Sequence, residues 1–337
     1  MNIAPITPER IAALGKAFRA SKTLFSAVEL GVFTALANGP RNLKMLRSDI
    51  GIAERGARDF FDSLVALKLL ERDEAGCYRN GPEAATYLDH NKPTYIGGEL
   101  NNFNKHGYPH WQFLTEALKT GKPQSVATAG NHFMDRYSNE SALESFAEAM
   151  TAGARLVAPA IVTKFPWHRY GTVIDIGACQ GALPVEIARA HGHLRGGGFD
   201  LPPVRPRFES YVESQGFSER LSFHEGDFLR DPLPSADVLI MGRVLHNWDV
   251  ATKKMLLKKV YDALPCAGAV IVYERMIDDE RRVSAPGLLS SLNMLIMTEG
   301  GFDYTIADLT GWMQGTGFHN LRVEQLTTEL PMIVGTK

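Results

Sequence analysis

Short apolar runs alternate with longer amphipathic stretches between residues 171 and 274. Apolar runs of this length are typical of strands, and apolar residues three or four positions apart are typical of helices. The alternation predicts βαβ units and a parallel sheet. We expect strands at 172–176, 196–200, 221–225, 236–242 and 268–274, and helices at 182–191, 204–215 and 251–264. At the end of the chain we expect a helix near 306–316, then strands at 319–325 and 331–336.

The first part of the chain has a helical pattern instead. Residues 10–35 carry apolar side chains at helical spacing, and Gly39-Pro40 ends that pattern. Two short helices at 43–50 and 54–69 precede a hairpin whose strands, 70–72 and 77–79, flank a loop containing Gly76. Helix, turn, helix and hairpin in this order predict a winged-helix-like domain. The domains we expect are 1–94 (winged-helix-like), 95–163 (a helical connection contributing to a substrate pocket) and 164–337 (the sheet domain).

Charge argues against a nucleic-acid partner. The segment that would read DNA, 53–66, has a net charge of −1, and the whole chain has a formal net charge of −2. A DNA-binding surface is expected to be basic, because phosphate contacts supply most of its affinity. No stretch approaches the ~20 apolar residues of a membrane helix. The three cysteines are far apart and the first residues do not read as a signal peptide, so we expect a cytoplasmic protein.

Four polar or glycine-containing segments each end one of the expected strands. They are Asp175 to Gly181, Asp200, Gly226-Asp227-Phe228, and Arg243 to Asp249. Ligands of open α/β sheets bind at the carboxyl edge, where such segments meet. The turn at 175–181 opens with an acid and lacks the G-x-G-x-x-G fingerprint, which disfavours a nicotinamide dinucleotide. The set suits a nucleoside beside a histidine available for proton transfer.

Each acid of this set has a specific expected role. Asp200 is placed to accept both hydroxyls of a ribose, against the alternative that it caps the following helix. Asp227 is placed to accept from an adenine amino group. Phe228 would cover one face of the adenine and Trp248 the other, since aromatic side chains stack on bases. Alone, each aromatic residue is more often part of a core.

In this order the segments resemble the class I S-adenosylmethionine (SAM)-dependent methyltransferases. Leu245-His246-Asn247-Trp248-Asp249 is similar to the small-molecule O-methyltransferases related to plant phenolic and hydroxyindole enzymes and to their bacterial natural-product relatives. The resemblance implies a Rossmann-like doubly wound seven-stranded α/β sheet whose last strand is antiparallel, and a homodimer formed by the N-terminal domain. It also implies SAM as cofactor, bound by Asp175, Gly177, Gly181, Asp200, Leu201, Gly226, Asp227, Phe228, Arg243 and Trp248.

The resemblance makes His246 the general base, against the alternative of a buried structural histidine. A phenol has a pKa near ~10, whereas a histidine near ~6.5 is largely neutral at pH 7 and accepts protons. Glu274, at the end of an apolar strand, and Asp303, where the family usually has Glu, are the acids expected to support it. Helix capping is the alternative for Asp303. Asn247 stands where the family commonly has Asp, which disfavours a metal site, so we expect no metal.

The residues that contact the methyl acceptor are the hardest to identify from the sequence. By resemblance, Asn101, Asn102, Met294 and Met297 contact a small aromatic substrate, although methionines also fill gaps in cores. We expect Trp111 to close one wall of the same pocket. The interpretation is a homodimeric SAM-dependent O-methyltransferase of secondary metabolism, with apolar Leu24, Phe25, Val28, Val32 and Phe33 forming the dimer contact. The alternatives are N- or C-methylation, a SAM-binding enzyme with another reaction, a winged-helix regulator, and a nicotinamide oxidoreductase.

Overall fold

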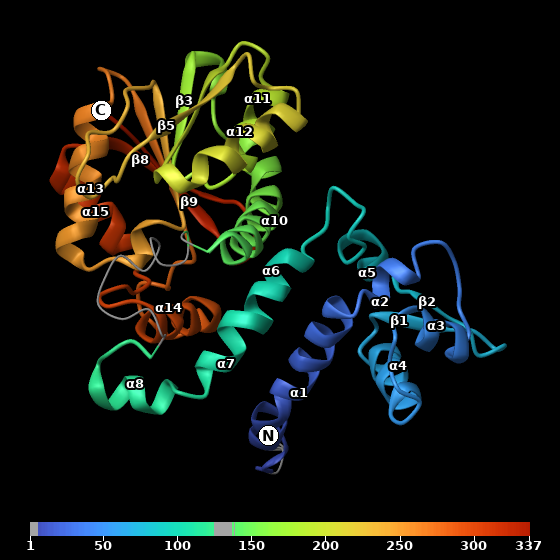
Figure 1. The fold of residues 1–337 in the computed structure, drawn as a ribbon. Coiled ribbons are helices and arrows are strands. Elements are labelled where there is room, and N and C mark those ends of the chain that lie inside the picture. The colour runs from blue at the N-terminus through green and yellow to red at the C-terminus, as the bar shows by residue number, and fades with distance from the viewer. Residues whose placement is uncertain (1–5, 125–136, 138) are drawn as a thin grey trace, which may run out of the picture. The chain divides into compact units, whose positions relative to one another are not determined.

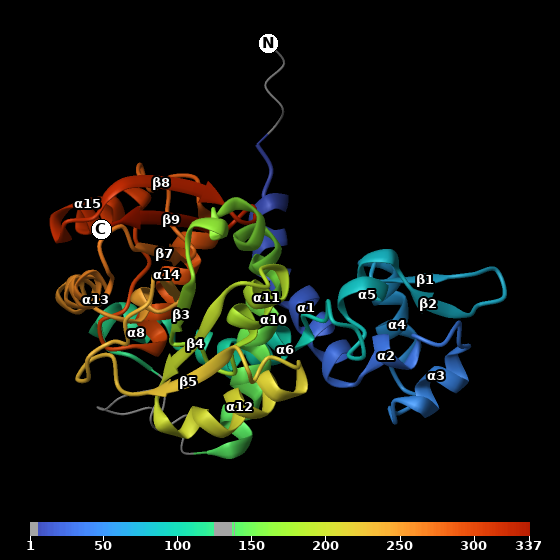
Figure 2. The ribbon, with the colours of Figure 1, turned by 90° about the horizontal axis from the view of Figure 1, so that it is seen from above.

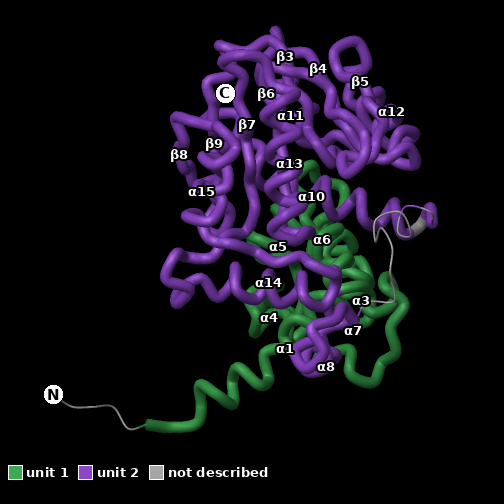
Figure 3. Tube along the Cα trace, turned by 90° about the vertical axis from the view of Figure 1, so that its left-hand side faces the viewer, with its two compact units in different colours: residues 1–106 green, residues 107–337 purple. Residues whose placement is uncertain are grey.

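The computed structural model describes residues 6–124, 137 and 139–337, and the chain divides into two units, 1–106 and 107–337 (Figure 3). The boundary falls inside a π-helical turn, Phe103–Gly107. Within the described ranges, no helix is both long and apolar enough to cross a membrane.

The N-terminal unit consists of helices and one small hairpin. Its elements are α1 (Glu9–Glu29), α2 (Val32–Ala35), α3 (Leu43–Asp49), α4 (Ala57–Ala66), β1 (Leu70–Arg72), β2 (Tyr78–Asn80), α5 (Pro82–Tyr87) and α6 (Gly97–Asn102). The hairpin is antiparallel, with Glu71 opposite Arg79. The helical pattern predicted over 10–35 forms two helices, because Gly31 adopts a left-handed φ of +70° between α1 and α2.

Apolar residues of α1 to α4 form the core of this unit. Val28, Val32 and Phe33 are buried in it, together with Phe61 and Leu64 of α4. The first two turns of α1 behave differently, because Ile11, Leu14 and Phe18 are 73%, 76% and 52% exposed. The exposed apolar surface that the sequence predicted at residues 24–33 is therefore found nearer the N-terminus, at residues 11–18.

The second unit is built on a seven-stranded sheet with helices on both faces (Figures 1 and 2). Its strands are β3 (Thr172–Ile176), β4 (Arg195–Asp200), β5 (Leu221–Glu225), β6 (Val238–Gly242), β7 (Ala269–Tyr273), β8 (His319–Gln325) and β9 (Pro331–Thr336). The spatial order is β5-β4-β3-β6-β7-β9-β8, and all neighbours are parallel except that β9 is antiparallel to both β7 and β8. The predicted Rossmann-like sheet with an antiparallel last strand is confirmed.

Alternate residues of the strands face opposite layers of helices. One core joins Ile174, Leu239 and Val272 to α13 (Val250–Ala263) and α15 (Ile306–Thr316). The other core joins the alternate residues of the same strands, such as Val173 and Ile240, to α10 (Glu140–Lys164) and α11 (Ala182–Ala190). Figure 2 shows these two layers of helices. The central strands are buried on both faces, which explains their continuous apolar runs.

The remaining helices are α7 (Tyr108–Trp111), α8 (Leu114–Thr120), α12 (Arg205–Ser214) and α14 (Ala285–Met297). α14 was not predicted, and it contains Pro286 and Gly287, two residues that disfavour the interior of a helix. Both lie in its first turn, where proline has no hydrogen bond to lose, and the Ser284 Oγ accepts from the Gly287 N–H at 3.3 Å. α14 contacts α7, α8 and the turn that carries His246.

Candidate active site

A pocket lies at the carboxyl edge of the sheet, where the four segments singled out in the sequence meet. It contains about 610 Å³ of space not filled by atoms, including its open mouth. Its lining residues are Tyr137, Phe146, Met150, Gly177, Cys179, Asp200, Leu201, Gly226, Asp227, Phe228, Gly242, Arg243, Val244, Asn247 and Trp248. The lining is mostly apolar and aromatic with a few polar groups, which is typical of small-molecule sites.

Asp200 ends β4 and lines this pocket. Its Oδ2 accepts the Cys179 N–H and its Oδ1 accepts the Leu201 N–H, both at 2.8 Å. Burial raises the pKa of Asp200 to about 6, and the two N–H groups oppose that rise. Each oxygen keeps a lone pair for a further donor, so the carboxylate is oriented by the backbone and remains able to accept ligand hydroxyls.

Two of the predicted cofactor residues do not line the pocket. Asp175 is buried in β3, and its pKa rises to about 8 through burial and the negative charge of Asp200. Gly181 has φ +83°, and a Cβ there would lie 2.5 Å from the Phe208 ring. Gly177, with φ +78°, does line the pocket. Thus Gly181 is required by the tight packing of the turn onto α12.

The two aromatic residues of the pocket are arranged edge to face. The Phe228 and Trp248 ring centroids are 5.9 Å apart and their planes meet at 88°. They therefore do not form the two parallel walls expected around one adenine. The Trp248 Nε1 is buried and donates to no residue that the structure describes. A buried donor without a partner is costly, so Trp248 offers a ligand a hydrogen bond as well as a ring edge.

Several lining residues were not predicted. Tyr137, Phe146 and Met150 precede or belong to α10, where their spacing is that of an ordinary helix core. A Cβ on Gly153 of the same helix would lie 2.6 Å from an Arg243 guanidinium nitrogen, so α10 passes directly against Arg243. No local signal in the sequence marks these positions, because they meet the sheet edge only in the folded chain.

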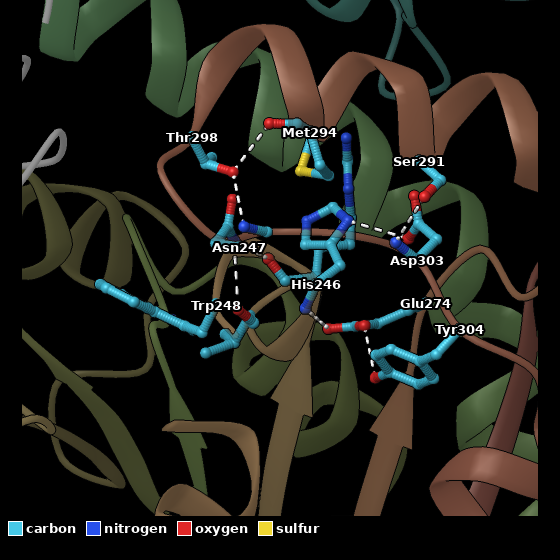
Figure 4. Close-up of polar contacts among 12 residues, drawn as sticks. His246, Asn247, Trp248, Glu274, Ser291, Met294, Thr298, Asp303 and Tyr304 are labelled. Atoms are coloured by element: carbon cyan, nitrogen blue, oxygen red, sulfur yellow. Dashed lines mark hydrogen bonds and ion pairs between the residues drawn. The ribbon is translucent and has the colours of Figure 1, made fainter. Parts of the chain in front are cut away.

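His246 lies outside this lining, on the 3₁₀ turn Leu245–Asn247 whose neighbouring residues form part of it. The His246 Nδ1 is 3.2 Å from the Asp303 Oδ1 (Figure 4). Asp303 therefore reaches the imidazole, although its side chain is shorter than that of the Glu expected from the resemblance. Glu274 contacts the turn differently: its Oε1 accepts the His246 backbone N–H at 3.2 Å and its Oε2 accepts the Tyr304 hydroxyl at 2.5 Å. Asp303 thus orients the ring, and Glu274 orients the turn.

Charge and burial act in opposite directions on this cluster. Burial favours neutral His246, but the charge of Glu274 and the hydrogen bond and charge of Asp303 outweigh it, so the pKa of His246 lies above its usual value; Arg243 opposes this. Burial raises the pKa of Glu274, against the opposing effects of His246 and Tyr304. Ligand atoms of His246, Glu274 and Asp303 lie within 4.8 Å of one another, close enough to share a cation.

The predicted substrate residues divide between the two units. Trp111 on α7 donates its Nε1–H to the Asn293 Oδ1 of α14 at 3.1 Å. α14 also carries Met294 and Met297, and Figure 4 draws Met294 above the His246 imidazole. Asn101 and Asn102 belong to α6 of the N-terminal unit, where the Oδ1 of each is buried and accepts from no described residue. Their part in a substrate site remains a prediction.

Gly301 holds the His246 turn in place through close backbone contact. A Cβ at this position would lie 2.3 Å from the Thr298 Oγ1 and 2.7 Å from the His246 carbonyl oxygen. We expect Gly301→Ala to displace the imidazole and lower kcat by about 10²-fold, the usual effect of a displacement near 1 Å. Steady-state kinetics with an accepted substrate measures this.

The matched control is Gly311→Ala in α15, where an added Cβ meets nothing within 4 Å. It should leave kcat unchanged and stabilise the fold by about 0.4–1 kcal/mol, as Gly→Ala does at compatible sites. An unchanged kcat in folded Gly301→Ala would contradict the role given to this glycine.

Comparison with known protein families gives a consistent assignment. The family model of the O-methyltransferase domain matches residues 111–319, and that of the O-methyltransferase dimerisation domain matches residues 13–90. Together the two models span most of the chain.

Individual relatives extend over nearly the full length. The chain is 41% identical over 330 residues to the tetracenomycin polyketide synthesis 8-O-methyl transferase TcmO of Streptomyces glaucescens, covering 98% of this chain and 97% of that protein. It is 33% identical to the N,N-dimethyltransferase OxyT of Streptomyces rimosus, covering 96% and 94%. The crystal structure of human N-acetylserotonin methyltransferase in complex with SAM superposes with a TM-score of 0.92 at 28% identity, covering 100% and 99%.

Proposed function

The chain belongs to the family of SAM-dependent O-methyltransferases, and we propose that it methylates a hydroxyl group of an aromatic small molecule with His246 as general base. The observation that carries the proposal is the Asp303–His246 pair beside a pocket suited to a nucleoside. The similarity to a polyketide O-methyltransferase supports a fused or phenolic aromatic acceptor from secondary metabolism.

Residues of the pocket fit SAM by their chemistry. Asp200 offers a backbone-oriented carboxylate for the ribose hydroxyls, and Trp248 offers a buried N–H without a protein partner. Gly177 keeps the β3–α11 bend free of a side chain; a Cβ there would approach Val244 to 3.0 Å. Asp227, whose Oδ1 already accepts the Leu229 N–H at 2.9 Å, remains able to accept from an adenine amino group.

His246 is the group suited to remove the acceptor's proton. When bound, SAM supplies a methyl group on a positively charged sulfur. The Asp303 carboxylate accepts the Nδ1–H of His246, which leaves Nε2 as the basic atom of the ring. Proton transfer from a hydroxyl to Nε2 produces an imidazolium, and Asp303 stabilises that cation as the acid does in a catalytic triad.

Methylation of an amine is the second candidate, because the chain is 33% identical to an N,N-dimethyltransferase over nearly its full length. An acceptor screen by mass spectrometry separates the two. Purified protein and SAM are incubated with matched pairs in which one aromatic scaffold carries a hydroxyl or an amino group. Preferential methylation of the hydroxyl member supports the proposal, and preferential methylation of the amino member replaces it with N-methylation.

We also propose that the enzyme is a homodimer joined through α1. The dimerisation family model covers residues 13–90 and so most of this helix, and Ile11, Leu14 and Phe18 form one exposed apolar face at i, i+3 and i+7. Isolated exposed apolar residues are normal, but an apolar helical stripe is typical of an interface.

Leu14→Glu combined with Phe18→Glu should convert the dimer to a monomer, because two charges would be buried without partners. Light scattering at micromolar concentration measures the mass. Val283→Glu is the control, since Val283 is 82% exposed in the second unit and should leave the dimer intact. A wild-type monomer, or a double variant that remains dimeric, would disprove this interface.

A further inference from the structure

Lys253 is a fully buried lysine behind the His246 turn. It lies in the first turn of α13, four residues after the N-cap Asp249, and it is 0% exposed. Lysine is almost never buried to this degree unless its charge is paired. Its neighbour Lys254 on the same helix is exposed. The general-base mechanism above gives Lys253 no role.

The Lys253 ammonium joins the two segments that carry the base and its orienting acid. It donates a hydrogen bond to the Trp248 carbonyl oxygen, two residues after His246. It also lies 3.5 Å from the centroid of the Phe302 ring and 5.3 Å from that of Tyr304, the residues on either side of Asp303. The face of an aromatic ring attracts a cation, and the attraction is stronger when the cation is desolvated.

The acids around His246 require a compensating positive charge. The Glu274 and Asp303 side chains are both 0% exposed, and the Asp303 Oδ2 accepts a hydrogen bond from none of the described residues. Two buried carboxylates are stable only with a cation or a proton nearby. If His246 supplied that charge in the resting enzyme, its ring would already be protonated and unable to act as a base.

We propose that Lys253 is a positioning residue for the transfer reaction: its buried ammonium is the resting counter-ion of Glu274 and Asp303, and it thereby favours the neutral His246 imidazole, which is free to accept the proton of the substrate. The inference deepens the proposed function, because it rests on His246 being the base. Two carboxylates and one ammonium leave the cluster one negative charge, which then stabilises the imidazolium formed during the reaction.

The charged groups around both side chains agree with this assignment. Burial lowers the pKa of Lys253 to about 8, but Glu274, Asp303 and Asp249 oppose the shift, so the amine still carries its proton at pH 7. Glu274 and Asp303 likewise favour protonated His246, and Arg243 opposes them. Removing the Lys253 charge leaves these two carboxylates with fewer cations, which increases the proton affinity of the cluster.

The test is a pH titration of His246 followed by NMR in full-length protein labelled at the histidine ring carbons. His246→Gln identifies the His246 signal by its loss. Lys253→Met, similar in length but uncharged, should move the His246 midpoint upward by about 1 pH unit, because the carboxylates that favour protonated His246 lose an opposing positive charge. Lys254→Met, which removes an exposed charge one residue away, should leave the midpoint unchanged.

Calorimetric titration with SAM shows whether Lys253→Met retains its fold and pocket. An unchanged midpoint in a variant that binds SAM normally would overturn the inference. A general structural defect would change SAM binding and broaden all histidine signals, whereas the proposed role moves one midpoint. Lys253→Arg keeps the charge and should restore the wild-type midpoint; a shift as large as that of Lys253→Met would also overturn it.

A measurement on the wild type covers the case in which Lys253 variants fail to fold. In infrared spectra at pH 7, Glu274→Gln and Asp303→Asn should each lack a carboxylate band that the wild type shows. Neither variant should lack a carboxylic-acid band. A carboxylic-acid band would show that a proton compensates the buried charge, and the inference would be wrong. None of these readouts needs an acceptor. Full activity of His246→Ala therefore disproves the proposed base separately from the role of Lys253.

Discussion

Replacing His246 with alanine should lower kcat by about 10²–10⁴-fold, the usual contribution of a positioned general base. The affinity for SAM should change little, because His246 lies outside the lining of the pocket that fits the nucleoside. Steady-state kinetics with an accepted hydroxylated substrate gives kcat, and calorimetry gives the dissociation constant of SAM. His319→Ala is the control, since His319 is exposed on β8.

The pH profile gives an independent test of the same base. The neutral imidazole is the active form, so the rate should be low at acid pH and rise as His246 loses its proton. Because Glu274 and Asp303 raise the pKa of His246 despite its burial, the midpoint should lie above the usual ~6.5 of histidine. In His246→Ala the rate should follow the ionisation of the acceptor instead. Wild-type activity of this variant at neutral pH would show that catalysis proceeds by proximity and desolvation alone.

Glu274→Gln should reduce kcat less than loss of His246. Glutamine keeps the shape of the side chain and an oxygen for the His246 backbone N–H or the Tyr304 hydroxyl, and it loses only the charge. The same substitution should lower the midpoint of the rate profile, because Glu274 is the largest of the charges that favour protonated His246.

Asp200→Ala should weaken SAM binding by about 2–4 kcal/mol, the loss of about two hydrogen bonds to a charged acceptor. This corresponds to a dissociation constant roughly 30–1,000-fold higher. The carboxylate also orders the turn through the Cys179 and Leu201 N–H groups, so both effects act in the same direction. Calorimetric titration measures the change.

Asp237→Ala is the matched control for Asp200. Asp237 also accepts two backbone N–H groups, from Gly171 at 2.8 Å and Thr172 at 2.9 Å, but these lie at the beginning of β3, away from the pocket. This variant loses comparable backbone contacts and should bind SAM normally. If Asp200→Ala remained folded with an unchanged dissociation constant, Asp200 would not contact the ribose.

Residues whose role follows from strand order could be predicted from the sequence. Asp200 ends a strand, and Asp227 and Arg243 each follow one. Parallel strands bring their carboxyl ends to one edge, so these residues can be placed together without knowledge of side-chain packing. Strand order does not predict whether the Asp303 side chain contacts His246. Its position in the chain left helix capping as an alternative, and the 3.2 Å contact with the imidazole, with Thr305 as the N-cap of α15, distinguishes them.

The periodicity of apolar residues determined this protein's sheet, most of its helices and the edge at which its ligand chemistry gathers, because strands and helices each impose a period on the residues they bury. The tertiary structure alone decided the perpendicular Phe228–Trp248 pair, the contribution of α10 to the pocket and the burial of Lys253. These depend on which helix faces meet across tens of residues. From the sequence, a lysine in a helix is expected to be exposed. In the folded chain the residues on either side of Asp303 cover Lys253, and only there does its charge acquire a role.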